Sequence, residues 1–303
     1  MRDFSQDHQW LSINTATLRK QWTLDRIIEE CAKRGIRAIS PWRDQVAAVG
    51  LEQIARQLRG TGIALSGYCR GGFFPAVDAA GRQQALLDNR RAIDEAKTLN
   101  APCLVLVVGA LPGALTGKPD YTDISRARTE VRDGIAATLE YARQVNMPLA
   151  IEPLHPMQAA ERACVNTLEQ ALDLCDELDP PDVGKDTPSV QGRVCHLGVA
   201  LDIYHVWWDP KLQQQIARAS SNPARNRLLA YHVCDWLTPT RDLLNDRGMM
   251  GDGVVELKKI RGWIEQAGYL GFSEVEIFSE TNWWLKPGEE VLDTCIARHR
   301  SAV

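Results

Sequence analysis

The ten residues LDIYHVWWDP (201–210) place two groups that can do chemistry inside an otherwise apolar run. Asp202 and His205 stand among Leu, Ile, Tyr and Val, in a pattern that predicts a buried strand at its start. A buried carboxylate is costly in free energy unless it is paired, hydrogen-bonded or bound to a metal ion. Asp202 therefore needs a partner, which must come from elsewhere in the chain.

Similar groups stand near the ends of three other apolar segments: Glu152 follows PLAI, His232 lies in LLAYHVC and Glu276 lies in EVEIF. Taken one at a time, a histidine or glutamate at a strand end is structural more often than functional. Three carboxylates and one imidazole together form an oxygen-rich ligand set, which suits Mn²⁺, Mg²⁺ or Co²⁺ better than a structural zinc ion. The four residues therefore predict one divalent metal ion, with Mn²⁺ as the first expectation and Zn²⁺ also compatible.

Eight short apolar segments alternate with amphipathic stretches along the chain and predict eight strands. The strands are expected at 10–14, 36–40, 63–68, 103–108, 148–153, 197–204, 228–234 and 273–278. Helices are expected between them, with Thr23 and Thr167 as N-caps and Gly35 as a C-terminal signal. The nearly continuous apolar character of the strands indicates a parallel sheet covered on both faces.

Eight strand–helix repeats in this length favour an α/β fold closed into a (β/α)8 TIM barrel, a single domain over residues 1–303. An open doubly wound sheet is the alternative, but it normally shows a glycine-rich turn after its first strand, and LSINTATLRK has none. In a barrel, catalytic groups lie at the carboxyl ends of the strands, and neighbouring strands are about 4.8 Å apart. Asp202 and its three candidate partners would then form an arc on four successive strands.

Composition and charge exclude several classes of protein. The chain is 45% hydrophobic and has a net charge of −4 with both signs interspersed, so we expect no nucleic-acid partner. The polar start MRDFSQDHQW is unlike a secretory signal, and no apolar run is long enough to span a bilayer, so we expect no membrane partner. Eight scattered cysteines without a CxxC pair favour reduced thiols in a cytoplasmic protein.

The segments IEPLHP, LDIYH, HVCD, GDG and EVEIF resemble the sugar isomerase/epimerase superfamily of xylose isomerase-like TIM barrels, which includes ketose 3-epimerases and inosose dehydratases. The resemblance spans the barrel, with its sharpest motifs in the second half. It implies that the Glu152, Asp202, His232 and Glu276 quartet binds one divalent metal ion and that His205 faces a small sugar substrate. It also implies an even-numbered assembly, a homodimer or a homotetramer.

The same resemblance gives Glu152 and Glu276 a catalytic role. A proton next to a carbonyl is too weakly acidic to leave at neutral pH unless a divalent metal ion stabilises the enediolate that forms. Two carboxylates on opposite faces of the substrate would invert a carbon centre, as in an epimerase, and one alone would give an aldose–ketose isomerase. We therefore expect a metal-dependent epimerase or isomerase of a keto sugar or sugar derivative.

Other functions use a related site or fold. If a β-hydroxyl leaves from the enediolate, the enzyme is a lyase or dehydratase, acting on an inosose-like cyclic keto-polyol or on a 3-keto glycoside. A DNA-repair endonuclease of the related fold would need a basic face and more ligands for a zinc cluster, whereas this chain has a net charge of −4 and only six histidines. A binding barrel without activity would have no need for four convergent ligands.

Further side chains at the predicted strand ends are candidates for substrate binding, because sugars stack on aromatic rings and hydrogen-bond to polar groups. These candidates are His155, Trp42, Tyr68, Arg70, Trp207 and its neighbour Trp208. Packing is the alternative for both tryptophans, and capping of the following loop is the alternative for His155. Ketose 3-epimerases commonly have an arginine six residues beyond the metal histidine, where this chain has Thr238, so Arg241 or Arg247 would replace it.

Two more carboxylates lie close to the predicted ligands in the sequence. Glu274 shares a strand face with Glu276 and would either support a metal ligand or hold a buried cation. Asp235 would orient the ring of His232 or a water molecule beside it. The segment CRGGFFP (69–75) is rich in glycine but lacks the spacing of a phosphate loop, so no nucleotide site is expected.

Overall fold

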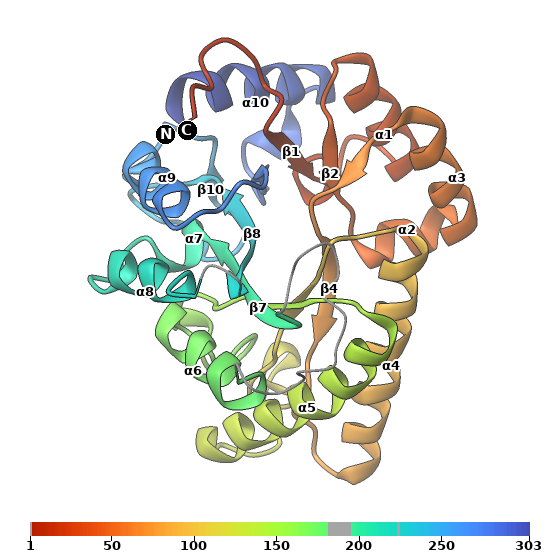
Figure 1. Cartoon of the computed structure of the whole chain (residues 1–303), viewed down its shortest axis with the longest axis vertical. Coiled ribbons are helices and arrows are strands. Elements are labelled where there is room, and N and C mark those ends of the chain that lie inside the picture. The colour runs from red at the N-terminus through yellow and green to blue at the C-terminus, as the bar shows by residue number, and fades with distance from the viewer. Residues whose placement is uncertain (1, 181–194, 223–224) are drawn as a thin grey trace.

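The computed structural model describes residues 2–180, 195–222 and 225–303, and Figure 1 shows strands at its centre with helices around them. Within these residues nine strands form one parallel sheet, in the order β3-β2-β1-β11-β8-β7-β6-β5-β4. The strands are β1 Leu11–Asn14, β2 Ala38–Ser40, β3 Ala64–Leu65, β4 Tyr68–Gly72, β5 Leu104–Val107, β6 Leu149–Ile151, β7 Leu197–Asp202, β8 Leu228–Val233 and β11 Ser273–Val275.

The sheet closes on itself where β3 and β4 meet. These two short strands are halves of one barrel strand, since β3 pairs with β2 and β4 pairs with β5. Trp42, just after β2, forms a parallel bridge to Cys69, whose N–H donates to the Pro41 carbonyl at 3.0 Å. The expected (β/α)8 TIM barrel is confirmed.

Helices follow the strands along the chain, and all but the short, buried α7 have residues exposed on the outside of the barrel. They are α1 Leu24–Lys33, α2 Arg43–Val49, α3 Leu51–Thr61, α4 Ala79–Thr98, α5 Ile124–Val145, α6 Leu168–Leu178, α7 Ile203–Val206, α8 Leu212–Ala219, α9 Leu257–Gln266 and α10 Gly288–Ala302. Thr167 caps α6, accepting a hydrogen bond from the N–H of Gln170 at 3.2 Å, as its sequence position predicts. Thr23 is the N-cap residue of α1 but makes no such side-chain bond.

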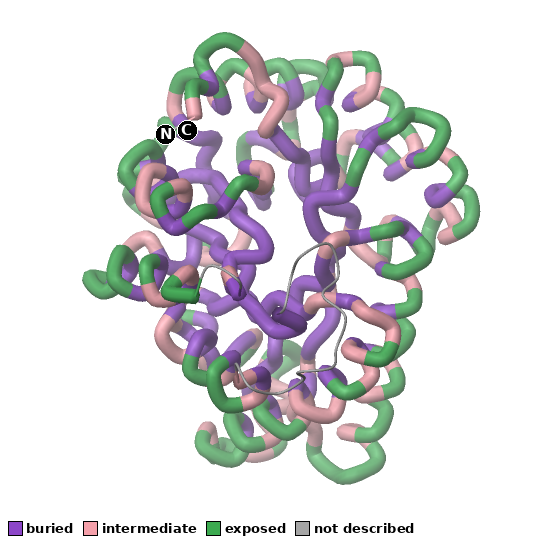
Figure 2. The backbone as a smooth tube through the Cα atoms, in the orientation of Figure 1, coloured by how far each residue is buried: buried purple, intermediate pink, exposed green. Residues whose placement is uncertain are grey.

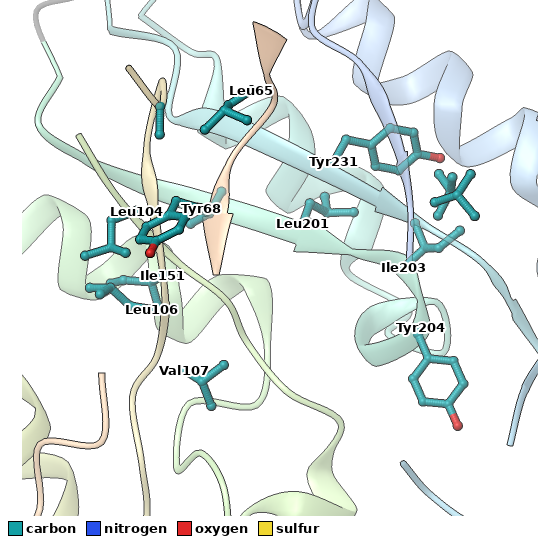
Figure 3. Close-up of a cluster of buried hydrophobic side chains, with 14 of the residues drawn as sticks. Leu65, Tyr68, Leu104, Leu106, Val107, Ile151, Leu201, Ile203, Tyr204 and Tyr231 are labelled. Atoms are coloured by element: carbon teal, nitrogen blue, oxygen red, sulfur yellow. The ribbon is translucent and has the colours of Figure 1, made fainter. Parts of the chain in front are cut away.

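Successive side chains along a strand point to opposite faces, so the buried side chains form two separate clusters. Side chains such as Leu104, Leu106, Ile151, Leu201 and Tyr231 belong to the large cluster that packs between strands and helices (Figure 3). Most side chains of a second, separate cluster are small: Cys69, Cys103, Val105, Ala150, Ala200 and Ala230 lie there together with Leu229. The backbone around the barrel centre is accordingly buried and the outer helices carry the exposed residues (Figure 2).

None of the eight predicted strands keeps its expected bounds, and those expected at 148–153 and 273–278 already end at Ile151 and Val275. Two other differences have a local cause. The strand expected at 63–68 is split, because the chain leaves the sheet at Ser66, whose hydroxyl donates to the Glu274 carboxylate. Its second half, β4, runs on to Gly72 through residues without an apolar pattern. The strand expected at 197–204 ends at Asp202, because the Asp202 carboxylate accepts the Tyr204 N–H at 2.9 Å and caps α7.

Two expectations about the class of protein can be compared with the structure. All eight cysteines are free and buried, in agreement with the predicted absence of a disulfide framework. In the part of the chain that the structure describes, no helix combines the length and the apolar character needed to cross a membrane.

Candidate metal centre

Four side chains that the sequence marks as metal-competent meet at the carboxyl end of the barrel. Glu152 directly follows β6, Asp202 ends β7, His232 lies in β8 and Glu276 directly follows β11. All four are buried, and one ligand atom from each lies within 4.8 Å of the others. The sheet register brings them together, because Asp202 is paired with His232 across β7 and β8.

The centre of this quartet favours a positive charge. Burial alone would lower the pKa of His232, but the surrounding carboxylates, above all Glu274, raise it well above its usual value. Glu152 Oε1 and His232 Nδ1 lie 3.0 Å apart, yet neither atom makes a hydrogen bond with any described residue. Buried polar atoms without hydrogen-bond partners, surrounded by carboxylates, form a donor set that fits a divalent cation.

Glu152 differs from an ordinary surface glutamate in its affinity for a proton. Burial raises the pKa of Glu152 to about 7, although the neighbouring His232 acts in the opposite direction. A carboxyl group with such a pKa can both accept and return a proton near neutral pH. The environment of Glu152 therefore fits a group that transfers protons.

Glu274 lies behind His232 on the neighbouring strand. Its Oε1 atom is 3.3 Å from His232 Nε2, on the ring edge opposite Nδ1. Asn14 Nδ2 donates to Glu274 Oε1 at 2.8 Å, and Ser66 Oγ donates to Oε2 at 2.7 Å, so the carboxylate is held from two sides. Of the two roles weighed for Glu274, this geometry fits the support of a metal ligand.

Of the two roles expected for Asp235, orienting the ring of His232 is not supported by its contacts within the described residues. Its carboxylate accepts backbone N–H groups from Trp236 at 2.9 Å, Gly251 at 2.9 Å and Val255 at 3.0 Å. Three backbone donors use the two oxygens of this carboxylate, so Asp235 shapes the GMMGDG (248–253) loop. The carboxylate nearest the opposite edge of the His232 ring is that of Glu274, 3.3 Å from Nε2.

A short antiparallel hairpin, β9 Asp235–Trp236 with β10 Arg247–Gly248, returns an arginine to the quartet. Arg247 Nη1 donates to Asp202 Oδ2 at 2.8 Å and to Glu276 Oε2 at 3.1 Å. Burial favours the protonated form of Asp202, but Arg247 lowers the pKa of this carboxyl to about 2. Arg241, the other candidate, is exposed.

His205 lies beside this arginine, on the first turn after β7. Its Nε2 atom is 3.2 Å from Arg247 Nη2 and 3.6 Å from Asp202 Oδ2. Burial lowers the pKa of His205 to about 3, so the imidazole is neutral at neutral pH. His205 Nδ1 makes no hydrogen bond within the described residues.

Aromatic rings flank the quartet in two groups. In one, Phe278 packs edge-on against Trp42 with the ring centroids 5.6 Å apart, and against Trp284 at 5.7 Å. In the other, His155 stacks on Trp236 at 4.8 Å and meets Trp208 edge-on at 6.0 Å. Flat apolar surfaces near a polar cluster are suited to stacking against a sugar ring.

Tyr68 does not belong to the site, in contrast to the prediction. Its side chain is fully buried in the outer core layer (Figure 3), and its hydroxyl donates to Glu95 Oε2 on α4 at 3.0 Å. The next residue, Cys69, faces the barrel interior, so alternation along β4 turns Tyr68 towards the helices. Strand position alone does not reveal which of two successive residues points inward.

Three other candidates lie near the site with mixed roles. His155 Nδ1 accepts the Met157 N–H at 3.3 Å and so caps the following loop, which was its structural alternative. Trp207 packs against the core and lies 5.8 Å from Trp236, while Trp208 is the one that contacts His155. Arg70 lies above the ring of Phe73, with 4.1 Å between its Cζ atom and the ring centroid.

Sequence reasoning missed Phe278, Trp236 and Trp284. Phe278 stands two residues after Glu276, and alternation along that segment could have revealed it. Trp236 lies in a two-residue strand of the hairpin, and Trp284 in a short turn before α10, where no periodic signal exists.

The sequence and the fold of this chain are similar to those of known proteins. The family model of the xylose isomerase-like TIM barrel matches residues 28–298. The crystal structure of protein SMc04130 from Sinorhizobium meliloti 1021 is 54% identical with a TM-score of 0.88, and the match covers 97% of this chain and 98% of that chain. No curated protein matches the sequence.

More distant structures share the fold. The IolI protein with a bound zinc atom has a TM-score of 0.77 at 18% identity, over 95% of both chains. The apo form of 3-keto-D-glucoside 4-epimerase, YcjR, from E. coli has a TM-score of 0.70 at 16% identity, over 97% of this chain and 99% of that chain. The family match over most of the chain confirms the resemblance carried by its short segments: the chain belongs to the xylose isomerase-like TIM barrel family.

Proposed function

We propose that this chain is a metal-dependent epimerase or isomerase of a keto sugar or sugar derivative. The observation that supports it most is the buried quartet of Glu152, Asp202, His232 and Glu276, whose ligand atoms lie within 4.8 Å of one another. A protein of the same fold is a 3-keto-D-glucoside 4-epimerase, which acts on a sugar carrying a ketone. Burying three carboxylates in one place is costly in free energy, and a role in catalysis accounts for that cost.

The quartet would hold one divalent ion, and we propose Mn²⁺ because three carboxylates and one imidazole form a hard ligand set. When bound, such an ion acts as a Lewis acid that polarises a carbonyl and makes the neighbouring C–H more acidic. Arg247 would add a second positive charge beside Asp202 and Glu276. These charges make proton removal next to a ketone accessible at neutral pH.

The two catalytic carboxylates in this proposal are Glu152 and Glu276. They follow β6 and β11, which are separated in the sheet by β7 and β8, so they stand at the two ends of the ligand arc. A sugar seated between them would meet one carboxylate on each face. One would take the proton from carbon and the other would deliver a proton to the opposite face, which inverts that centre.

His205 and the aromatic rings would position the substrate. The neutral imidazole of His205 has a free Nδ1 among the described residues and can hydrogen-bond a sugar hydroxyl or carbonyl oxygen. Trp42 and Phe278 on one side, with Trp208 on the other, offer surfaces for the apolar face of the ring. Fixed orientation matters because the reacting C–H must align with a carboxylate oxygen.

Proton exchange measured by NMR tests this function. Protein loaded with Mn²⁺ and then exchanged to a diamagnetic Mg²⁺ form would be incubated in D₂O with ketohexoses, 3-keto glucosides and inososes. We expect deuterium at a carbon next to a ketone with the wild type, and at least a ~100-fold lower rate with Glu152→Gln or Glu276→Gln. The exposed Glu280→Gln serves as the matched control and should exchange at the wild-type rate.

The products separate the related reactions. An inverted centre indicates an epimerase, an aldose indicates an isomerase, and an unsaturated ketone indicates a dehydratase. Absence of exchange with every substrate class, or exchange that survives both glutamate substitutions, would show that the quartet does not perform this chemistry.

A further inference from the structure

A line of polar contacts joins the candidate metal ligand His232 to the ring of Trp42. The Trp42 indole N–H donates to Asn14 Oδ1 at 2.7 Å, and Asn14 Nδ2 donates to Glu274 Oε1 at 2.8 Å. The same carboxylate oxygen lies 3.3 Å from His232 Nε2. These four residues form the Asn14 network, which runs from the start of α2 through the end of β1 to β11 and β8.

The side-chain amide of Asn14 can take only one orientation in this network. Its Oδ1 atom accepts the N–H groups of the Trp42 indole and of the Ala16 backbone, at 2.7 and 3.1 Å, and both groups can only donate. Its Nδ2 atom faces the Glu274 carboxylate, which accepts. An amide that accepts on one side and donates on the other is polarised by both bonds, so the bond to Glu274 strengthens the bond to Trp42.

The inner part of the network is shielded from water. Asn14, Glu274 and His232 are all fully buried. Hydrogen bonds and charges interact more strongly in such a buried site than in water, and a lost partner leaves a buried polar group unsatisfied. Trp42 is only half-buried, so the network ends at a partly accessible ring.

A second line of contacts places the Trp42 ring beside the quartet. The ring packs edge-on against Phe278 with the centroids 5.6 Å apart, and the guanidinium carbon of Arg247 lies 5.0 Å from the Phe278 centroid. Arg247 itself donates to Asp202 and Glu276. Trp42 therefore stands at the wall of the candidate site, one ring away from the cation that contacts two of the candidate ligands.

The backbone of Trp42 is held independently of its ring. Its N–H donates to Thr15 Oγ1 at 3.2 Å, and the residue forms a parallel bridge to Cys69. The bond from the indole to Asn14 therefore acts on the rotation of the ring and not on the position of the main chain. A change in charge at Glu274 would reach the ring through this bond.

We propose that Asn14 is a positioning residue that couples the Trp42 ring to the metal ligand His232, so that metal binding fixes the ring on which the substrate stacks. This inference deepens the proposed function, on which it rests for the stacking of a sugar on Trp42. With an ion bound, the His232 imidazole loses electron density and its Nε2–H binds Glu274 more strongly, which holds Asn14 and Trp42 in place. The coupling is reciprocal, so loosening the Trp42 ring also weakens metal binding.

The indole signals in ¹H–¹⁵N NMR spectra test the coupling without relying on turnover. The apo protein would be titrated with diamagnetic Zn²⁺, and the Trp42 indole signal would be assigned by its absence from Trp42→Phe. We expect this signal to shift when the ion binds to the wild type. Most of the shift should be lost in Asn14→Leu, which keeps the size of the side chain but makes neither hydrogen bond. Ser66→Ala, which removes the other side-chain donor to Glu274, is the matched control and should keep the shift.

Metal affinity gives a second readout. Calorimetric titration with Mn²⁺ would be applied to Trp42→Phe, Glu274→Gln and the double variant. We expect Trp42→Phe, which keeps a ring but has no N–H, to weaken Mn²⁺ binding by about 2- to 5-fold, and to have no effect in the Glu274→Gln background. Trp284→Phe removes an indole N–H that donates to the Ala16 carbonyl, and it should leave the Mn²⁺ affinity unchanged. These variants retain Asn14, so this measurement stands even if Asn14→Leu does not fold.

The proposal is overturned if the Trp42 signal shifts equally in the wild type and in Asn14→Leu, because the ion would then act through space. It is also overturned if Trp42→Phe changes the Mn²⁺ affinity to the same extent in both backgrounds, or if the wild type binds neither ion. The D₂O exchange experiment is independent of this coupling. Exchange on a keto sugar without coupling would contradict only the role of Asn14, and coupling without any exchange would contradict only the proposed function.

Discussion

Among the charges around His232, the carboxylate of Glu274 raises its pKa most strongly. Glu274 lies 3.3 Å from His232 Nε2 and is itself held by Asn14 and Ser66. A carboxylate in this place keeps Nδ1 free for a metal ion and strengthens the ring as a ligand. Replacing the Glu274 carboxylate by an amide of the same shape removes its negative charge, so most of its effect on His232 as a metal ligand is lost.

Glu274→Gln should therefore weaken metal binding by about 10- to 100-fold, because the negative charge behind His232 disappears while the side chain keeps its size. Calorimetric titration of the apo protein with Mn²⁺ measures the effect directly. Glu280→Gln, at an exposed position, provides the comparison. An affinity equal to that of the wild type would mean that Glu274 only packs the barrel interior.

Arg247 is predicted to stabilise the protein most when no metal ion is bound. It is the cation that contacts both Asp202 and Glu276, at 2.8 and 3.1 Å. Removing one partner of a buried charge cluster leaves the others uncompensated, at a cost of about 3 to 5 kcal/mol. Arg247→Met should lower the unfolding free energy of the apo protein by this amount.

Addition of Mn²⁺ should then stabilise Arg247→Met more than it stabilises the wild type, because the ion replaces part of the lost positive charge. Chemical denaturation with and without the ion gives both quantities. Arg247→Lys, which keeps the charge but not the planar fork, should lie between the two proteins. Equal apo stabilities of Arg247→Met and wild type would contradict the ion-pair geometry.

At the scale of elements, the turn that ends β4 is built around a glycine. Gly72 has φ +107°, and a Cβ atom there would lie 1.9 Å from the Val107 carbonyl oxygen. The Asn89 side chain bonds both the N–H and the carbonyl of Gly72, at 2.7 and 2.9 Å. This turn fixes the strand that carries Arg70.

Gly72→Ala should destabilise the protein by about 3 kcal/mol, from backbone strain and from overlap with β5. The matched control is Gly60→Ala in α3, where a Cβ atom would meet nothing within 4 Å. That change should raise the unfolding free energy by about 0.5 to 1 kcal/mol. Thermal unfolding of both variants measures the contrast, and similar effects at the two positions would argue against the tight β4–β5 contact.

The strands also show which parts of the fold and of the candidate site can be predicted from the sequence. Apolar runs and their spacing predict the barrel and the strand ends that carry Asp202 and Glu152, because burial on both faces of a parallel strand leaves a strong pattern. The apolar pattern does not predict the second half of β4, because Arg70 and two glycines interrupt the apolar residues of this strand. It also fails for the β9–β10 hairpin, whose two-residue strands have no period, so the sequence names Arg247 as a candidate without placing it beside Asp202.

At the scale of the whole molecule, the two ends of the chain lie side by side (Figure 1). Phe4 stacks on His299 of α10 with the ring centroids 4.5 Å apart, and Arg300 donates to the Gln6 carbonyl at 2.7 Å. His299 is fully buried, and neither ring nitrogen makes a hydrogen bond within the described residues. The packing of the two chain ends therefore depends on a histidine that must stay neutral.

This histidine makes stability depend on pH. Burial lowers the pKa of His299 to about 3 from 6.5, helped by the neighbouring Arg261, His8 and Arg2 and opposed by Asp7. Between these two values the unfolded chain binds a proton that the folded chain does not. The contribution of His299 to the free energy of unfolding is thus fully present above pH 6.5 and falls as the pH falls, by up to about 1.4 kcal/mol per pH unit.

His299→Phe should keep the stacking on Phe4 and lose this dependence. Urea denaturation at about pH 7.5 and about pH 5 would compare the variant with the wild type. We expect a smaller acid-induced loss in the variant. An identical loss in both proteins would show that other groups account for the acid sensitivity.

The central claim is that Glu152, Asp202, His232 and Glu276 bind one divalent metal ion. Anomalous diffraction from crystals grown with Mn²⁺ tests it most directly. The account predicts one anomalous peak about 2.0 to 2.4 Å from a ligand atom of each of the four side chains. Crystals of Asp202→Asn, which keeps the shape but not the charge, should show a much weaker peak. A wild-type quartet without a peak, in crystals that contain the ion elsewhere, would contradict the claim.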